Sequence, residues 1–228
     1  MRTFVDLNHV ISDGMVTYPG LPVPTVATHL SRDQAEEIYG PGVTFDIGMV
    51  TLCTNTGTYL DMPFHRFADG ADLSELPLEQ VVDVPAVCVD RRGQRAIDLS
   101  ADDLFGVEGH AVLVRTGHDR HFGSDAYAQD APFLTAGAAE ALVAADVSCV
   151  GIDSLNVDDA GDLARPAHTS LLAAGIPIIE HLTNLDRLPP AGFTFTAVPP
   201  RILGAGTFTV RAFATLPARS DSVAEHVG

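Results

Sequence analysis

The sequence contains no lysine, and its 13 basic residues are all arginines. Without a lysine amine, the chain cannot form a lysine Schiff base, anchor pyridoxal phosphate or supply the lysine of a phosphate-binding P-loop. The shortage of cations also gives a formal net charge of −17 at pH 7. Nucleic acids and anionic membrane surfaces both require a basic face, so we expect neither of them as a partner.

Cysteines and long apolar runs are also scarce. Cys53, Cys88 and Cys149 are odd in number and far apart, which favours buried small hydrophobes over a disulfide framework. No apolar run is long enough to span a bilayer, and the N-terminus lacks the apolar core of a signal peptide. These features predict a cytoplasmic protein. The sequence has no Gly-x-Ser-x-Gly elbow, dinucleotide fingerprint or phosphate loop.

The length of 228 residues suits one domain with its own core, and we predict that residues 1–228 form a single domain. Many strand patterns with few helices between them predict a mixed α/β sheet. The expected strands cover residues 3–11, 43–53, 85–90, 110–117, 147–153, 176–182, 193–198 and 207–215. The expected helices cover residues 72–82, 136–146 and 169–174, and residues 31–39 are read as a helical turn or a mobile flap.

Residues 55–65 carry the densest group of reactive side chains. The segment reads Asn55-Thr-Gly-Thr-Tyr-Leu-Asp-Met-Pro-Phe-His65. Gly57 and Pro63 fix turns rather than extend regular structure. Burying so many polar groups without partners would cost about 1–3 kcal/mol each. The segment therefore indicates a functional site rather than a core element.

This segment resembles the signature His-x-Gly-Thr-His-x-Asp-x-Pro-x-His of the cyclase / kynurenine formamidase / isatin hydrolase family. The matching residues are Gly57, Thr58, Asp61, Pro63 and His65. Asn55 and Tyr59 stand where the family has its two other histidines. The resemblance implies a swivelling β/β/α fold, association into a homodimer or homotetramer, and a small-molecule substrate.

Two distant residues complete the predicted site. His168 opens an apolar helix, and Glu180 lies twelve residues later in the following strand. A helix that turns back into a strand can place its first residue near the last residue of that strand. The pair also resembles the distal metal ligands of the family. The resemblance implies that Asp61, His168 and Glu180 hold one divalent metal, zinc or manganese, and that His65 is the general acid/base.

The replacement of two imidazoles by Asn55 and Tyr59 leaves three alternatives open, because an amide and a phenol are weak metal ligands. A single metal persists, or Tyr59 and His65 work as acid and base without metal, or the protein binds a ligand without catalysis. The expected activity is hydrolysis or cyclisation at an amide, lactam or ester carbonyl. The alternative is a metal-independent cyclase or dehydratase of a biosynthetic intermediate. The candidate substrate contacts are Asn55, Thr58, Arg66 and His118.

Overall fold

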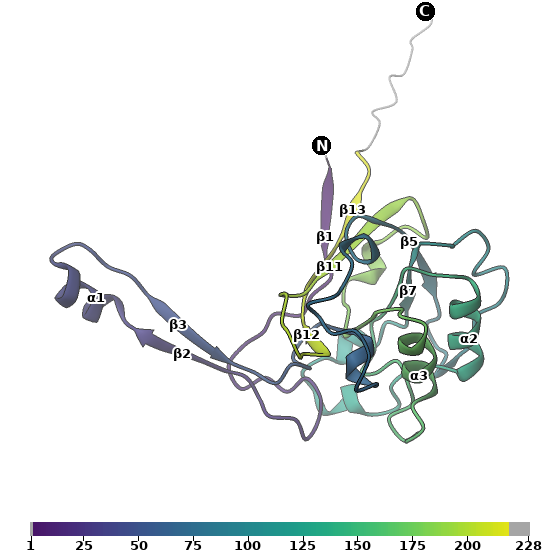
Figure 1. Cartoon of the computed structure of the whole chain (residues 1–228), viewed down its shortest axis with the longest axis horizontal. Helices are drawn as coiled ribbons and strands as arrows, with labels where there is room; N and C mark the ends of the chain where they lie inside the picture. The colour runs from purple at the N-terminus through teal and green to yellow at the C-terminus, as the bar shows by residue number, and fades with distance from the viewer. Residues whose placement is uncertain (1, 219–228) are drawn as a thin grey trace, which may run out of the picture.

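The computed structural model describes residues 2–218 and is built around one large mixed sheet (Figure 1). Within these residues the strand order is β1-β13-β11-β5-β7-β9-β10-β4-β12. The strand bounds are β1 Thr3–Asp6, β4 Tyr59–Asp61, β5 Val84–Asp90, β7 Ala111–Arg115, β9 Cys149–Ile152, β10 Ile178–Glu180, β11 Phe193–Val198, β12 Thr207–Thr209 and β13 Arg211–Leu216.

The remaining elements are short. Two small sheets pair β2 (Thr25–Leu30) with β3 (Ile47–Thr51) and β6 (Ala96–Ile97) with β8 (Phe133–Leu134). The α-helices are α1 Arg32–Tyr39, α2 Ala136–Ala144 and α3 Pro166–Ala173. Single 3₁₀ turns cover Pro63–His65, Leu78–Gln80, His118–His121, Asp125–Ala128 and Leu185–Arg187.

The centre of the large sheet is parallel, from β5 through β7 and β9 to β10. Successive side chains of a strand point to opposite faces. Val112 and Val114 of β7 accordingly pack into a first hydrophobic cluster, which includes residues of α2 and α3. Ala111 and Leu113 pack into a second hydrophobic cluster. Because both faces are covered, these strands are apolar at almost every position, as parallel strands usually are.

The second hydrophobic cluster shows that the sheet curls. It contains Val5 of β1, Phe195 of β11 and Leu60 of β4, which are the first, third and eighth strands in the order. These residues can share one cluster only because the sheet bends around it. The prediction of a mixed α/β sheet is confirmed, and the structure adds that this sheet is curled.

The two helices that cover the sheet begin and end as their sequences indicate. The Thr135 side chain accepts a hydrogen bond from the Ala138 N–H and caps α2. Pro166 occupies the first position of α3, where its missing N–H costs nothing. Gly175, with φ of +73°, follows the end of α3 in the left-handed region that favours glycine. In residues 2–218 no helix is long and apolar enough to cross a bilayer.

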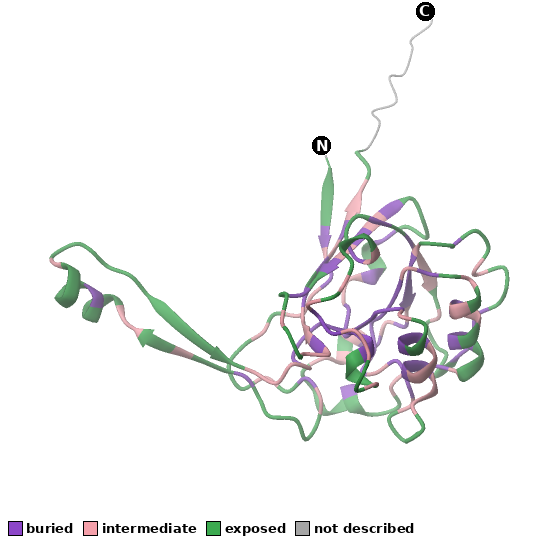
Figure 2. Cartoon of the chain, viewed as in Figure 1, coloured by how far each residue is buried: buried purple, intermediate pink, exposed green. Residues whose placement is uncertain are grey.

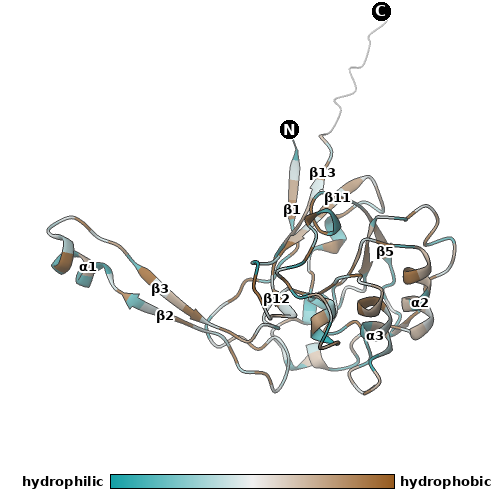
Figure 3. Cartoon of the chain, viewed as in Figure 1, coloured by the Kyte–Doolittle hydropathy of each residue, from teal (hydrophilic) through white to brown (hydrophobic). Residues whose placement is uncertain are grey.

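A hairpin arm of β2, α1 and β3 extends away from the body (Figure 1). Ser31 and Gln34 form a capping box at the start of α1. Every residue of β3 is exposed, and the arm is almost entirely exposed in Figure 2. Apolar residues nevertheless occur along its strands, where the ribbon is coloured brown in Figure 3. The predicted strand over residues 43–53 therefore belongs to an exposed two-stranded ribbon rather than to the core sheet.

The predicted helix over residues 72–82 is wrong, because only Leu78–Gln80 form a 3₁₀ turn. The carboxylate of Asp72 accepts hydrogen bonds from both the backbone and the hydroxyl of Ser74. Such local bonds compete with helix formation. Pro77 then lacks the N–H that a helix through this segment would need.

Candidate functional site

The register of β4 and β10 brings together residues that are far apart in the sequence. These strands are antiparallel neighbours, with Glu180 opposite Tyr59 and Ile178 opposite Asp61. Residues two apart in a strand share a face, so Tyr59, Asp61 and Glu180 lie on the same face of the sheet. α3 adds His168, whose Nε2 lies 3.8 Å from Glu180 Oε1. The structure thus brings the three predicted ligands into one place.

Asp61 has one carboxylate oxygen without a hydrogen-bond partner. Its side chain is fully buried, and Oδ1 accepts a hydrogen bond from the Thr207 hydroxyl at 2.6 Å. In the described part of the chain, residues 2–218, Oδ2 has no hydrogen-bond partner and lies 3.6 Å from His168 Nε2. Leaving a buried carboxylate oxygen unpaired is costly, so a buried acid of this kind is expected to meet a cation.

The cluster around Asp61 fits a divalent metal ion. One ligand atom each from Asp61, His65 and His168 lies within 4.8 Å of the other two. Two imidazoles and a carboxylate form a donor set that suits zinc or manganese. The unpartnered Asp61 oxygen faces this cluster and would be satisfied by the ion. Glu180 lies beside the cluster but is not part of this closest set.

His168 is held in position by Asp158, a residue that the sequence did not indicate. The Nδ1 of His168 lies 2.6 Å from Asp158 Oδ2, and the Ala167 and His168 backbone N–H groups also donate to this carboxylate. Burial raises the pKa of Asp158, but the hydrogen bonds from His168 and these N–H groups outweigh it and hold the pKa below its ordinary value. Nε2 of His168 therefore faces Asp61, as in the carboxylate–histidine pairs that orient metal ligands.

Glu180 and Tyr59 form a buried pair. The Tyr59 hydroxyl donates to Glu180 Oε2 at 2.6 Å, and the Val157 N–H donates to Oε1 at 2.5 Å. Burial raises the pKa of Glu180 to about 7. Burial and the neighbouring Glu180 raise the pKa of Tyr59 well above 10. The phenol thus stays protonated at neutral pH and holds the carboxylate, which disfavours it as the base of a metal-free mechanism.

Thr207 determines which nitrogen of His65 carries the proton. Its single hydroxyl proton is donated to Asp61, so its oxygen accepts from the Nδ1–H of His65, at 2.9 Å. This assignment follows from the hydrogen-bond pattern. Nε2 of His65 is then the unprotonated nitrogen. Gly206 allows this close approach, because a Cβ there would lie 2.4 Å from the His65 backbone nitrogen.

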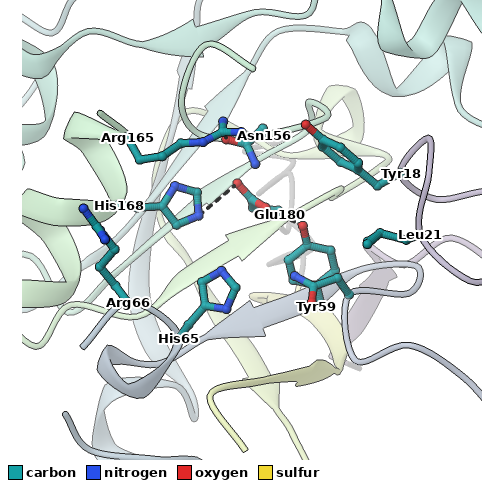
Figure 4. A pocket seen from close by; sticks show the side chains of 10 residues that line it. Tyr18, Leu21, Tyr59, His65, Arg66, Asn156, Arg165, His168 and Glu180 are labelled. Atoms are coloured by element: carbon teal, nitrogen blue, oxygen red, sulfur yellow. Dashed lines mark hydrogen bonds and ion pairs between the residues drawn. The ribbon is translucent and has the colours of Figure 1, made fainter. Parts of the chain in front are cut away.

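The site opens into a cavity of about 300 Å³ (Figure 4). Its walls come from the N-terminal loop, the signature segment, the loop before α3, α3 itself and β10. The residues that line it are Tyr18, Leu21, Asn55, Tyr59, His65, Arg66, Asn156, Arg165, His168 and Glu180.

The sequence of this chain matches a known protein family. The sequence profile of the Cyclase family, described as “Putative cyclase”, matches residues 5–159, more than half of the chain. The chain belongs to this family. Kynurenine formamidase from Bacillus cytotoxicus is 28% identical over 210 residues, covering 92% of this chain and 95% of the relative. Kynurenine formamidase from Salinibacter ruber is 28% identical over 218 residues, covering 91% and 95%.

A solved structure shares the fold of this cyclase-family chain. Isatin hydrolase A from Ralstonia solanacearum matches it with a TM-score of 0.81 at 24% sequence identity. The match covers 95% of this chain and 92% of that chain. The resemblance to the cyclase family that the signature indicates is therefore confirmed, together with its fold.

Two predicted substrate contacts of this cyclase-family chain lie outside the cavity. The Thr58 side chain is fully buried, and its hydroxyl donates to the backbone oxygen of His181. It lies next to Tyr59 in the chain and therefore points the other way. His118 lies within 2.8 Å of the Tyr127 backbone oxygen, through Nε2, and lines a separate cavity. Asn55 and Arg66 do line the site.

Sequence reasoning missed several residues that shape the site. Tyr18 and Leu21 come from a proline-rich loop near the N-terminus, where no motif singles them out. Asp158 lies in the loop between β9 and α3, and Arg165 is the last residue of that loop. No spacing rule singles out either residue. The backbone of Arg165 does mark it in the structure. Its φ of +51° is unusual for a residue other than glycine, and such residues are often functional.

Proposed function

We propose that this cyclase-family chain is a metal-dependent hydrolase that acts on an amide, lactam or ester carbonyl of a small-molecule substrate, or that cyclises such a group. The observation that carries the proposal is the unpartnered Asp61 oxygen facing His65 and His168. Metal-dependent hydrolysis of an amide C–N bond is also the activity that the relatives named kynurenine formamidase support.

The ion that we propose is a single zinc or manganese. Asp61 and His168 would hold it, with Glu180 completing the set from its position 3.8 Å from His168. Asn55 and Tyr59 replace the two imidazoles that a second ion would need, and Tyr59 is already bonded to Glu180. A divalent ion in this position would supply Lewis acidity toward the substrate carbonyl and toward water.

His65 is the group that we propose moves the proton. The hydrogen bond with Thr207 fixes its ring and leaves Nε2 free to accept a proton. The His65 side chain is 36% exposed, so that it reaches solvent as well as the cavity. Asn55, at the cavity wall, is a neutral hydrogen-bonding group for the substrate.

Metal analysis combined with activity assays tests the proposal. The protein is purified without added metal and assayed with N-formylkynurenine and with isatin, before and after chelation. We expect about one divalent ion per chain, loss of turnover on chelation, and recovery with zinc or manganese. Full turnover by protein that is free of metal would contradict the proposal. Metal-loaded, folded protein that is inactive on both compounds would exclude these substrates.

We also propose that the chain forms a homodimer or homotetramer through the hairpin arm. Val26 and Val50, which are opposite each other in the ribbon, are about half exposed. An isolated two-stranded ribbon is marginally stable in water, so a partner surface would stabilise it. Sedimentation equilibrium should show that Val50→Glu shifts the protein toward monomer, whereas Val82→Glu on the body should not. Monomeric wild-type protein would contradict this proposal.

The cytoplasm is the compartment that we propose for the protein. Cys53, Cys88 and Cys149 are all free thiols. Free thiols are the usual state of cysteine in a reducing compartment.

A further inference from the structure

Two arginines of the cavity have no acidic partner. In residues 2–218 the guanidinium groups that pair with carboxylates within 4.0 Å belong to other arginines. Arg66 and Arg165 make only neutral contacts, although the chain carries 30 acidic residues against 13 arginines. In so acidic a protein, two cavity arginines without carboxylates are available to an anionic ligand.

Arg165 is fixed in place by neutral groups. Its Nη1 donates to Asn156 Oδ1 at 3.2 Å and to the backbone oxygen of Asp159 at 3.3 Å. The Asp159 carboxylate instead pairs with Arg95, at 3.2 Å. The backbone of Arg165 is left-handed and immediately precedes α3, so the strain is held by the helix that follows it. These contacts orient the guanidinium, and no carboxylate of residues 2–218 lies within 4.0 Å of it.

Arg66 approaches the same helix from the signature segment. Its Nε donates to the Thr169 hydroxyl at 3.2 Å, and its guanidinium carbon lies 6.0 Å from the centre of the Phe67 ring. Thr169 follows His168 directly in α3. Figure 4 shows Arg66 and Arg165 on the His168 side of the cavity, and Tyr18 and Leu21 on the opposite side.

The cavity thus has a cationic side, which also carries His168, and an opposite side formed by Tyr18 and Leu21. A guanidinium binds a carboxylate through two parallel N–H groups more strongly than it binds a neutral oxygen. We infer that the substrate carries a carboxylate, which Arg66 and Arg165 bind, and an apolar or aromatic group, which Tyr18 and Leu21 contact. The position of the reacting carbonyl between them rests on the proposed hydrolase function.

This assignment explains how an acidic protein would bind an acidic substrate. The chain has a net charge of −17, and this count includes Glu180, which lines the cavity, and Asp61, which lies next to His168 of the cavity wall. Both charges oppose the approach of an anion. Two unpaired arginines beside the cavity offset this repulsion. The affinity for an anionic ligand should therefore fall as ionic strength rises, because salt screens exposed charges.

Binding of a matched pair of probes tests the inference without any turnover. Phenylacetate and phenylacetamide have the same ring and nearly the same shape but differ in charge. Dissociation constants are measured by NMR titration for the wild type, Arg165→Gln and Arg66→Gln, in both metal-loaded and chelated protein. Arg201→Gln, which removes an exposed arginine outside the cavity, is the control for the lost charge.

We expect each cavity variant to weaken phenylacetate binding by about tenfold or more while changing phenylacetamide binding by less than about twofold. Arg201→Gln should leave both unchanged. Equal losses for the two probes would assign the arginines a packing role and overturn the inference, as would unchanged phenylacetate affinity or its failure to bind the wild type. Circular dichroism verifies folding, and the two single variants are independent if one of them fails to fold. Because no reaction is measured, failure of the hydrolase assignment would not mimic these results.

Discussion

Replacing Asp61 by asparagine is expected to remove the metal and to weaken the metal-free protein as well. Asparagine retains an oxygen to accept the Thr207 hydrogen bond. It loses the charged oxygen that faces the cluster. We expect catalysis to fall by about a thousandfold or more, since a metal ligand and its charge are both lost.

The metal-free protein should also lose stability. Burial lowers the pKa of His168, but Asp158, Asp61 and Glu180 outweigh it and raise this pKa to about 10, so that the charged imidazole pairs with Asp61 at 3.6 Å. Asp61→Asn removes one partner of this buried pair and should therefore lower the free energy of unfolding of chelated protein by about 1–3 kcal/mol, measured by urea denaturation. Asp69→Asn, an exposed acid in the same segment, is the matched control. Undiminished metal content and activity in Asp61→Asn would refute the assignment.

Replacing His65 by glutamine is expected to abolish most catalysis while leaving the metal in place. Glutamine can still donate to the Thr207 oxygen, so the local structure should persist, but it cannot accept and release a proton. General acid–base catalysis contributes about 10²–10⁴-fold, and we expect kcat to fall by this factor. Metal content is measured on the same sample.

The metal measurement distinguishes the two roles that the geometry allows for His65. One of its nitrogens lies within 4.8 Å of ligand atoms of Asp61 and His168. Retained metal with low kcat supports a proton carrier, whereas loss of the ion from His65→Gln would show that the imidazole is a ligand. His29→Gln, on the exposed arm, controls for the loss of an imidazole elsewhere.

The core elements could be predicted from the sequence because their patterns are local. β7, β9 and α2 lie within the expected ranges, since continuous apolar runs and the Thr135 cap are signals within a few residues. The alternation in residues 43–53 correctly indicates a strand, but it does not specify which surface the strand meets. That depends on distant partners, and among residues 2–218 β3 pairs only with β2.

The site could be predicted only where its residues share a motif or a short connection. Asp61 and His65 lie in one segment, and His168 and Glu180 are joined by one helix and one turn. Thr207 reaches Asp61 only because β12 pairs with β4 in a register that places the two opposite each other. No local pattern encodes such a register.

α3 has a consequence for how this chain could acquire new substrates. Its first turn carries His168, is preceded by Arg165, and presents Thr169 to Arg66. The proposed chemistry and the proposed recognition thus both depend on this helix of eight residues and on the residue before it. A displacement of this helix would misalign both functions together. Changes in specificity should therefore arise by exchanging side chains around its first turn, while Asp158 keeps the backbone of the helix in place.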